Sequence, residues 1–296
     1  MKVLIAGASG LIGSALVTVL EADGAEVTRL VRSTPKPGEI EWHPNQDEMD
    51  PAQLEGFDAV INLAGENVAG GRWTEEQKKK IHDSRVNGTH LLSEAMAKLS
   101  KKPRVFLCAS ATGFYGDRDD EVLDEHSDSG GGFLAGVCRE WEMATEPAAA
   151  AGVRVVNLRF GVILSKNGGM LAKLLTPFKM GMGGKVGSGK QFISWVAIDD
   201  AVDVIKLALH DQTFRGPVNV VSPNPVSNEV FTKTLGHVLS RPTALAMPAF
   251  AARLAFGEMA DEMLLASQVV VPKRLNDAGF EFKYPELEPA LRKYVG

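Results

Sequence analysis

The sequence predicts an α/β fold in which a doubly wound parallel sheet carries a smaller α/β lobe. Two observations support this prediction. Apolar, strand-like runs alternate with helical segments up to about residue 164, and this alternation is typical of parallel strands joined by crossover helices. The first strand also runs directly into a glycine-rich turn and a helix, an order that places a ligand at the carboxyl ends of the strands.

The glycine-rich turn has the sequence GASGLIG at residues 7–13 and lies between a buried strand at 2–6 and a helix that ends near Gly24. The N–H groups and the positive dipole end of such a helix favour a pyrophosphate. Gly7 allows the tight turn, Gly10 the close approach of a phosphate, and Gly13 the close packing of helix on strand. The motif therefore predicts a Rossmann dinucleotide site. Its cofactor contacts are assigned to Gly7, Ser9, Gly10, Leu11, Ile12 and Gly13.

The next strand, at residues 26–32, indicates which dinucleotide is bound. Sites that prefer NAD usually carry an acidic residue at the end of this strand, where it holds the ribose 2′-hydroxyl. Here Val31 stands at that position, followed by Arg32 and Ser33. A cation and a hydroxyl bind the 2′-phosphate of NADP better than they bind the free ribose diol of NAD, so these residues predict NADP. The alternative is that Arg32 is an exposed arginine that closes the strand.

The other strands of the predicted sheet begin at residues 58, 104 and 154, and the last of them is expected to continue to residue 164. The strand from residue 58 ends in Leu63, Ala64 and Gly65, a turn against whose backbone a cofactor can lie. Between the strands we expect a loop at 34–50, a long helical segment at 73–101 that is interrupted or bent near residues 87–89, and a single helix at 133–152.

The pattern changes after residue 164, where seven glycines lie between residues 168 and 190. A strand, a helix and another strand follow, and the rest of the chain is mainly helical. The sequence therefore predicts a Rossmann domain at 1–165, a first part of the second lobe at 166–195, a return to the sheet at 196–222, and a carboxyl-terminal part of the lobe at 223–296.

The composition is that of an ordinary globular protein, with 45% apolar and 23% charged residues. A net charge of −5 gives no support for binding to nucleic acid or to an anionic membrane surface. No apolar run has the length of a membrane span and no signal peptide is evident, so we expect a cytoplasmic protein. Cys108 and Cys138 are expected to be reduced and unpaired, and no metal site is expected.

Several short motifs resemble those of the extended short-chain dehydrogenase/reductases: GASGLIG at 7–13, INLAG at 61–65, VNGT at 86–89, ATGFYG at 111–116 and WVAIDDAV at 195–202. NLAGEN at 62–67 and the glycine-rich segment that ends at Trp195 are similar to the subgroup labelled epimerase family protein. The resemblance implies an NADP-binding Rossmann domain, a carboxyl-terminal substrate lobe, an unknown small-molecule substrate and a homodimer. It also implies cofactor contacts from Arg85, Ser110 and Ile163, and a substrate cleft lined by Lys190, Gln191 and Trp195.

The proton relay of those enzymes is missing from this sequence. They use a Tyr-x-x-x-Lys pair on one helix face, and alignment on Glu142 places Leu134 and Cys138 at the two positions. Arg85 replaces the usual asparagine and Ala111 the usual serine. Arg85 is then either a cofactor contact or a surface arginine.

Three residues of the 110–116 segment remain as catalytic candidates, and they are Ser110, Thr112 and Tyr115. The motif itself favours Tyr115 as part of a pocket wall. Cys138 is better explained as a buried small residue than as a nucleophile, because Arg139 points elsewhere on a helix. Two hypotheses follow. The protein is an oxidoreductase or epimerase that binds NADP(H) and uses a non-standard proton donor, or it is a catalytically silent NADP(H)-binding sensor or scaffold.

Overall fold

Seven parallel strands form the central sheet of the computed structural model, which describes residues 1–44 and 49–295. Their order is β11-β7-β5-β4-β1-β2-β3, so the direction of winding reverses between β1 and β4. The bounds are β1 Lys2–Ala6, β2 Glu26–Val31, β3 Glu39–Glu41, β4 Ala59–Asn62, β5 Val105–Ala111, β7 Arg154–Phe160 and β11 Gly216–Val220. The predicted doubly wound sheet is confirmed, and its switch point lies beside the glycine-rich turn.

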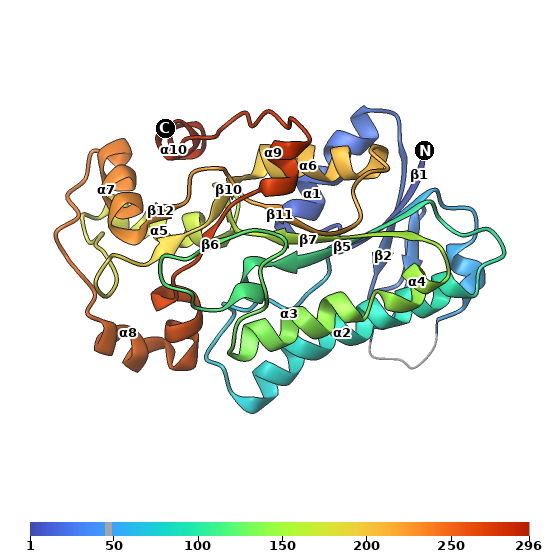
Figure 1. Ribbon diagram of the computed structural model, residues 1–296, viewed down its shortest axis with the longest axis horizontal. Helices are drawn as coiled ribbons and strands as arrows, with labels where there is room; N and C mark the ends of the chain where they lie inside the picture. The colour runs from blue at the N-terminus through green and yellow to red at the C-terminus, as the bar shows by residue number, and fades with distance from the viewer. Residues whose placement is uncertain (45–48, 296) are drawn as a thin grey trace.

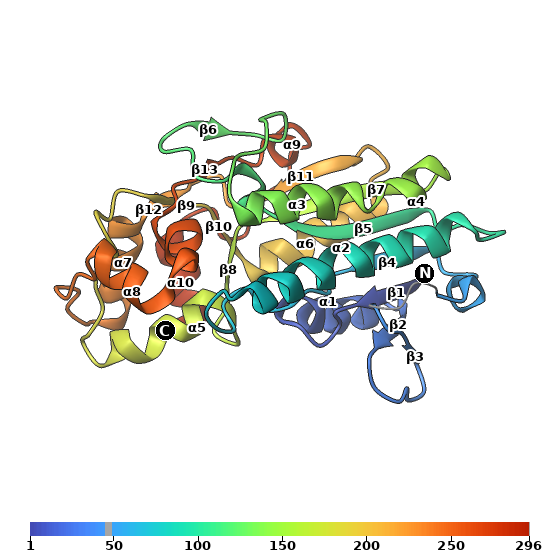
Figure 2. The same cartoon turned by 90° about the horizontal axis from the view of Figure 1, so that it is seen from below.

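Helices cover both faces of this sheet, as Figures 1 and 2 show. One face carries α1 Leu11–Ala22 and α6 Ile198–His210, and the other carries α2 Glu75–Ala97, α3 Phe133–Met143 and α4 Glu146–Ala150. The central strands are buried between these layers, since every residue of β4 and β7 is buried. Short 3₁₀ turns at Pro51–Leu54 and Thr112–Tyr115 complete this part of the chain.

The second lobe lies at one end of the sheet and has a core of its own, which includes Leu164, Leu171, Trp195, Phe231 and Leu291. Its helices are α5 Gly169–Lys179, α7 Asn228–Leu239, α8 Ala249–Phe256 and α10 Leu287–Val295, with a π-helical turn at Ala260–Leu265. Two short strand pairs support them, β8 Val162–Leu164 with β10 Trp195–Ala197 and β9 Phe192–Ile193 with β12 Val226–Ser227. A third pair joins β6 Val122–Leu123 to β13 Val269–Val270, and α9 Lys273–Asp277 packs near β11.

The interruption expected near Gly88 is absent, because α2 is one continuous helix from Glu75 to Ala97. A side chain on Gly88 would lie 3.1 Å from the Pro44 side chain and 3.3 Å from the ring of Trp42. This glycine therefore allows close packing of the helix and does not break it.

Two other predicted elements are divided in the structure. The helix at 133–152 is divided after Met143 into α3 and α4, because Pro147 lies in the first turn of α4 and cannot continue the hydrogen bonding of α3. The strand at 154–164 separates at Gly161, and β8 leaves the main sheet to pair with β10. A side chain on Gly161 would lie 2.6 Å from the Ser194 carbonyl, so only glycine permits this approach.

The predicted loop at 34–50 contains the short strand β3, and its residues 45–48 lie outside the described residues. Within residues 1–44 and 49–295, the structure contains no helix with the length and apolar character needed to cross a membrane.

We expect Gly13→Ala to lower the free energy of unfolding by about 1–3 kcal/mol, because overpacking against backbone has a cost of that order. A Cβ at this position would lie 2.2 Å from the Gly7 carbonyl oxygen. Urea denaturation measures the change. Gly136→Ala is the matched control, since its nearest neighbour would be the Arg139 side chain at 3.7 Å and an alanine should stabilise α3 by about 0.5–1 kcal/mol. Equal stabilities of the two variants would contradict the prediction.

Candidate functional site

The glycine-rich turn and the turn after β4 lie in direct contact at the switch point. Gly7 has φ +78°, and a side chain there would lie 2.6 Å from the Leu63 carbonyl carbon. The Gly10 amide closes the turn by donating to the Gly7 carbonyl at 3.0 Å. Gly13 faces the turn, and its close contact is with Gly7 and Ala8. Three glycines thus leave the amino end of α1 open to a phosphate, as the sequence predicts.

A buried hydrogen-bond cluster fixes the turn that follows β4. The Asn62 side chain donates to the Thr89 hydroxyl at 2.8 Å, and its carbonyl oxygen accepts from the Ala64 amide at 3.1 Å. The indole of Trp141 donates to the same hydroxyl at 2.9 Å. Thr89 lies on α2 and Trp141 on α3, so both helices of this face hold Leu63, Ala64 and Gly65 in place.

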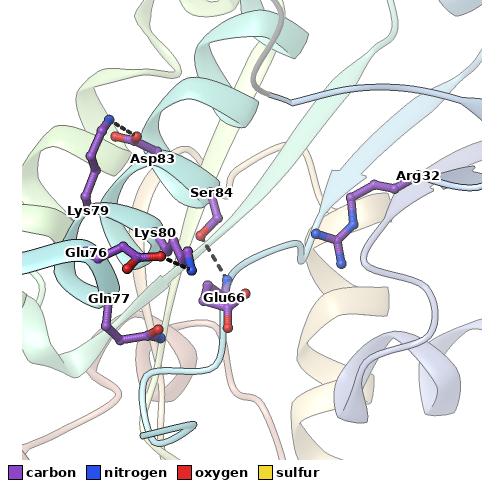
Figure 3. A pocket seen from close by; sticks show the side chains of 8 residues that line it. All are labelled: Arg32, Glu66, Glu76, Gln77, Lys79, Lys80, Asp83 and Ser84. Carbon is purple, nitrogen blue, oxygen red and sulfur yellow. Dashed lines mark hydrogen bonds and ion pairs between the residues drawn. The ribbon is translucent and has the colours of Figure 1, made fainter. Parts of the chain in front are cut away.

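Arg32 lines a cavity of about 630 Å³ between the end of β2 and the first half of α2. Figure 3 shows Arg32 on one side of it, Ser84 and Lys80 on the α2 side, and the loop of Glu66 between them. Lys80 is paired with Glu76 at 2.6 Å, whereas no carboxylate among residues 1–44 and 49–295 lies within ion-pair distance of Arg32. Arg32 is exposed and available to an anion, which fits the residue predicted to hold a 2′-phosphate.

The other predicted cofactor residues lie at the same carboxyl edge of the sheet. Val31 ends β2, and Ile163 lies on β8 beside the glycines that begin α5. The side chain of Leu11 contacts Gly168 at the same place. The structure therefore brings together the two turns, the end of β2 and the entrance to the second lobe. Arg85 reaches this edge from α2, with its guanidinium against Gly65.

The face of α3 that should carry the relay is closed by packing. A side chain on Gly113 would lie 3.4 Å from the Leu134 Cβ and 3.8 Å from the Cys138 sulfur. Both positions therefore face the turn at 112–115. Burial raises the pKa of the Cys138 thiol to about 11, and the nearby Glu142 carboxylate adds to that increase. This thiol is not an activated nucleophile.

Glu142 lies one turn further along the same face and forms a buried ion pair. Its Oε1 and Oε2 accept from Arg159 Nε and Nη2, each at 2.8 Å. Its Oε1 also accepts from the Ser110 hydroxyl at 2.7 Å. Ser110 is itself buried, so this catalytic and cofactor candidate is engaged inside the protein.

Tyr115 is a structural residue in this site. Its ring is fully buried, its hydroxyl accepts from Arg159 Nη1 at 3.0 Å, and it donates to the Asn219 side chain at 2.7 Å. Burial raises the pKa of this phenol. The burial and the two hydrogen bonds of this hydroxyl support the reading of Tyr115 as part of a pocket wall, which the motif favours over a role as an acid. Thr112 begins the 3₁₀ turn and is also buried.

The structure also contradicts two of the residues assigned to a substrate cleft. Trp195 is completely buried in the core of the second lobe. Gln191 is buried and donates to the carbonyls of Val186 and Leu264, both at 2.9 Å. Neither residue lines an open cleft, because both side chains are buried inside the second lobe. Lys190 is exposed.

A carboxylate from the carboxyl-terminal part of the lobe occupies the amino end of α3. Glu262 accepts from the amides of Phe133 and Leu134 at 2.6 and 2.7 Å. Gly132, with φ +99°, permits this approach, since a side chain there would lie 2.8 Å from a Glu262 oxygen. Lys78 binds Glu258 at 2.5 Å in the same region. These contacts hold the second lobe against the amino ends of α2 and α3.

The sequence analysis did not identify the buried network formed by Arg159 and Asn219 or the contact that Glu262 makes with α3. It used Glu142 only to align the helix that should carry the relay. For Arg159 a signal exists, because an arginine inside the apolar run of β7 requires a buried partner. Glu262 gives no such signal, since it lies in an acidic segment that resembles a solvated surface.

We expect neither cysteine to react with iodoacetamide at pH 8 in the folded protein. Burial raises the pKa of Cys108 to about 12 and that of Cys138 to about 11, so the reactive thiolate is scarce at this pH. Mass spectrometry should show no alkylation before urea is added and two modified cysteines afterwards. Rapid labelling of Cys138 in the native protein would contradict this prediction and restore it as a nucleophile.

We expect Glu262→Ala to loosen the second lobe, because two charge-assisted hydrogen bonds worth about 1.5–3 kcal/mol each are lost. Hydrogen exchange should accelerate at the amides of Phe133 and Leu134 and over residues 249–265. Asp261→Ala is the control, since the Asp261 carboxylate pairs with Arg253 of its own segment, at 2.8 Å. An Asp261 variant that opens the amides of α3 as strongly would show that the Glu262 contact is not specific.

Comparison with known proteins gives two family matches. The model described as the NAD dependent epimerase/dehydratase family matches residues 3–221, and a domain of unknown function, DUF1731, matches residues 247–294. An epimerase family protein of Mycobacterium bovis is 44% identical over 290 residues, which cover 98% of this chain and 96% of that protein. The human epimerase family protein SDR39U1 is 36% identical over 298 residues, which cover 100% of this chain and 100% of that protein.

The crystal structure of human SDR39U1 (isoform 2) with NADPH is also similar to this chain. Its TM-score is 0.91 at 33% identity, and the match covers 100% of this chain and 99% of that chain. The fold similarity therefore includes the second lobe as well as the sheet. The resemblance inferred from the short motifs is confirmed, and the chain belongs to the NAD dependent epimerase/dehydratase family.

Proposed function

We propose that this chain binds NADP(H) across the carboxyl edge of its sheet and acts on a small molecule held between the sheet and the second lobe. The observation that carries the proposal is the glycine-rich turn packed against Leu63, with Arg32 beside it in a cavity of about 630 Å³. The NADPH in the human relative supports the same choice of cofactor. The backbone amides at the start of α1 would hold the pyrophosphate, and Arg32 with Ser33 would hold the 2′-phosphate.

For the reaction we propose an oxidoreductase or epimerase that works without the Tyr–Lys relay. NADP(H), when bound, supplies or accepts a hydride. Of the residues at the relay positions, Leu134 carries no titratable group and Cys138 is buried, so they do not supply the Tyr–Lys pair. A substrate's proton must therefore come from water or from a group outside α3. Leu134 and Cys138 instead pack against the turn at 112–115.

A specific observation favours a second candidate function, that of a catalytically silent NADP(H)-binding sensor or scaffold. Ser110 and Tyr115 are committed to the buried network around Glu142 and Arg159, and Glu262 occupies the amino end of α3. These contacts remove the side chains that would otherwise handle a proton. Cofactor binding is common to both candidates, so only turnover separates them.

We expect Arg32→Ala to weaken NADPH binding about ten- to hundredfold, because a charge-assisted contact to a phosphate is worth about 1.5–3 kcal/mol. Its NADH affinity should stay unchanged. Fluorescence titration of both nucleotides measures this. Arg29→Ala is the control, since Arg29 lies on the same strand and binds Glu21 at 2.6 Å. Equal losses for NADPH and NADH would contradict the assignment of Arg32 to the 2′-phosphate.

Turnover is tested in two assays, because an oxidoreductase consumes NADPH whereas an epimerase returns its hydride and leaves the absorbance unchanged. NADPH absorbance is followed with a panel of carbonyl compounds, and nucleotide sugars incubated with NADP⁺ are followed by proton NMR for a changed sugar configuration. The enzyme hypothesis expects turnover in one of the two assays, at the same rate in Tyr115→Phe protein that remains folded. Tight NADPH binding with no turnover in either assay favours the silent binder.

A further inference from the structure

One exposed segment of the second lobe is almost entirely apolar. Residues 244–256, ALAMPAFAARLAF, contain Arg253 as their single polar side chain. Leu245, Phe250 and Leu254 are 60%, 73% and 77% exposed. Phe250 and Leu254 lie one turn apart on α8, so both project from the same side of this helix. An apolar run of this length is normally buried, so an exposed one indicates a surface that another body covers.

A second segment lies beside the first and adds two exposed methionines to it. Backbone hydrogen bonds join the two segments, from the Met247 amide to the Lys185 carbonyl and from the Gly187 amide to the Met247 carbonyl, both at 2.8 Å. Figures 1 and 2 show α5, α7 and α8 at the end of the molecule opposite to the N-terminus. We call the exposed apolar side chains of these two segments the apolar tip, which consists of Met180, Met182, Leu245, Met247, Phe250 and Leu254.

The segments that carry the apolar tip are also basic. Residues 162–198 and 230–257 contain eight Lys and Arg and no Asp or Glu. Of the 32 basic residues in the chain, 24 therefore lie elsewhere, together with all 37 acidic ones, and the net charge of −5 conceals this distribution. Arg241 Nε donates to the Lys179 carbonyl at 2.8 Å, which places both residues beside the methionines. Within residues 1–44 and 49–295, neither side chain has a carboxylate at ion-pair distance.

The carboxylates that follow α8 are engaged with partners of their own. Glu258 pairs with Lys78 at 2.5 Å, and Asp261 pairs with Arg253 at 2.8 Å. Glu262 accepts from two amides at the amino end of α3. These negative charges are therefore compensated, and the uncompensated charge next to the apolar tip is positive.

An anionic lipid surface fits this combination better than a protein partner. A second copy of the chain would bring its own uncompensated cations against these, which is unfavourable. Lys is depleted in protein interfaces, whereas apolar side chains flanked by Lys and Arg are typical of segments that lie on an anionic membrane. Side chains that protrude from a loop and a short helix can enter the boundary between headgroups and acyl chains, which extends about 5–10 Å inward.

We propose that the apolar tip inserts into the surface of an anionic membrane while Lys179 and Arg241 bind the lipid phosphates. Phe250 and Leu254 contribute most of the apolar area that leaves water, since they are the most exposed members of the tip. The chain attaches from one side of the bilayer and does not cross it. Because the tip lies on the second lobe, this attachment does not depend on NADP(H).

Co-sedimentation of the full-length protein with vesicles tests the proposal. The vesicles contain phosphatidylcholine alone or an equimolar mixture with phosphatidylglycerol. We expect binding to the mixed vesicles that weakens with added salt, and no binding to phosphatidylcholine alone. The double variant Phe250→Ser/Leu254→Ser should bind about ten- to hundredfold more weakly, because less apolar area is buried. Met143→Ser is the matched control, since Met143 is 60% exposed but ends α3.

The cations are tested separately from the apolar side chains. Lys179→Gln/Arg241→Gln should weaken binding to the mixed vesicles about thirtyfold, since each cation near an anionic surface contributes about fivefold. Lys36→Gln/Lys98→Gln is the matched control, because both lysines are exposed and lie outside the second lobe. Phe250→Trp protein should shift its emission to shorter wavelength when mixed vesicles are added, and Met143→Trp protein should not.

Several results would overturn the proposal. Wild-type protein that stays in solution with both kinds of vesicle would do so, as would equal binding by the tip variants and their controls. A dimer in solution that becomes monomeric in Phe250→Ser/Leu254→Ser, without vesicle binding by the wild type, would assign the tip to a second copy instead. A native melting temperature in each variant shows that it is folded, and the Phe250→Trp emission decides the question if the serine variant does not fold.

Discussion

The interaction on which the rest of the site depends is the buried ion pair between Glu142 and Arg159. Their side chains are 13% and 4% exposed, and two parallel hydrogen bonds of 2.8 Å join them. Either charge alone in this place would cost several kcal/mol, so α3 and β7 must dock in one register for the protein to fold. The Ser110 hydroxyl also donates to the Glu142 carboxylate, so the ion pair lies directly beside Ser110. The face of α3 that could carry a proton relay is therefore used to hold the sheet and the helix together.

The same pair links the Rossmann sheet to the carboxyl-terminal part of the chain. From Arg159 the hydrogen bonds continue through the hydroxyl of Tyr115 to Asn219, whose amide nitrogen donates to the Val271 carbonyl at 3.0 Å. The Asn219 backbone amide donates to Glu125 at 3.0 Å, and burial raises the pKa of that carboxyl. Residues more than 100 positions apart thus share one polar network. The second lobe is consequently held from both sides, here and through Glu262 at the start of α3.

Sequence reasoning identified what local patterns determine and missed what long-range packing determines. The turn at 7–13 is defined by neighbours along the chain, so its glycines and its place between β1 and α1 could be predicted. Arg32 could be placed because it directly follows β2, the next strand along the chain after that turn. Gly88 was misjudged because its partners, Trp42 and Pro44, are distant in sequence. The buried role of Tyr115 depends on Arg159 and Asn219, and neither partner can be inferred from the motif that contains the tyrosine.

Cofactor binding and proton transfer depend on different parts of this architecture, and the chain shows that they can separate. The proposed cofactor binding would use backbone amides, three glycines and Arg32 after β2, none of which belongs to α3. Proton transfer in the family pattern would use side chains of α3, and here that helix presents Leu134, Cys138 and a paired Glu142. Changes on α3 therefore leave the phosphate turn intact. A glycine-rich turn that opens a helix is evidence for a bound nucleotide, whereas evidence for the reaction must come from the side chains on the face of α3.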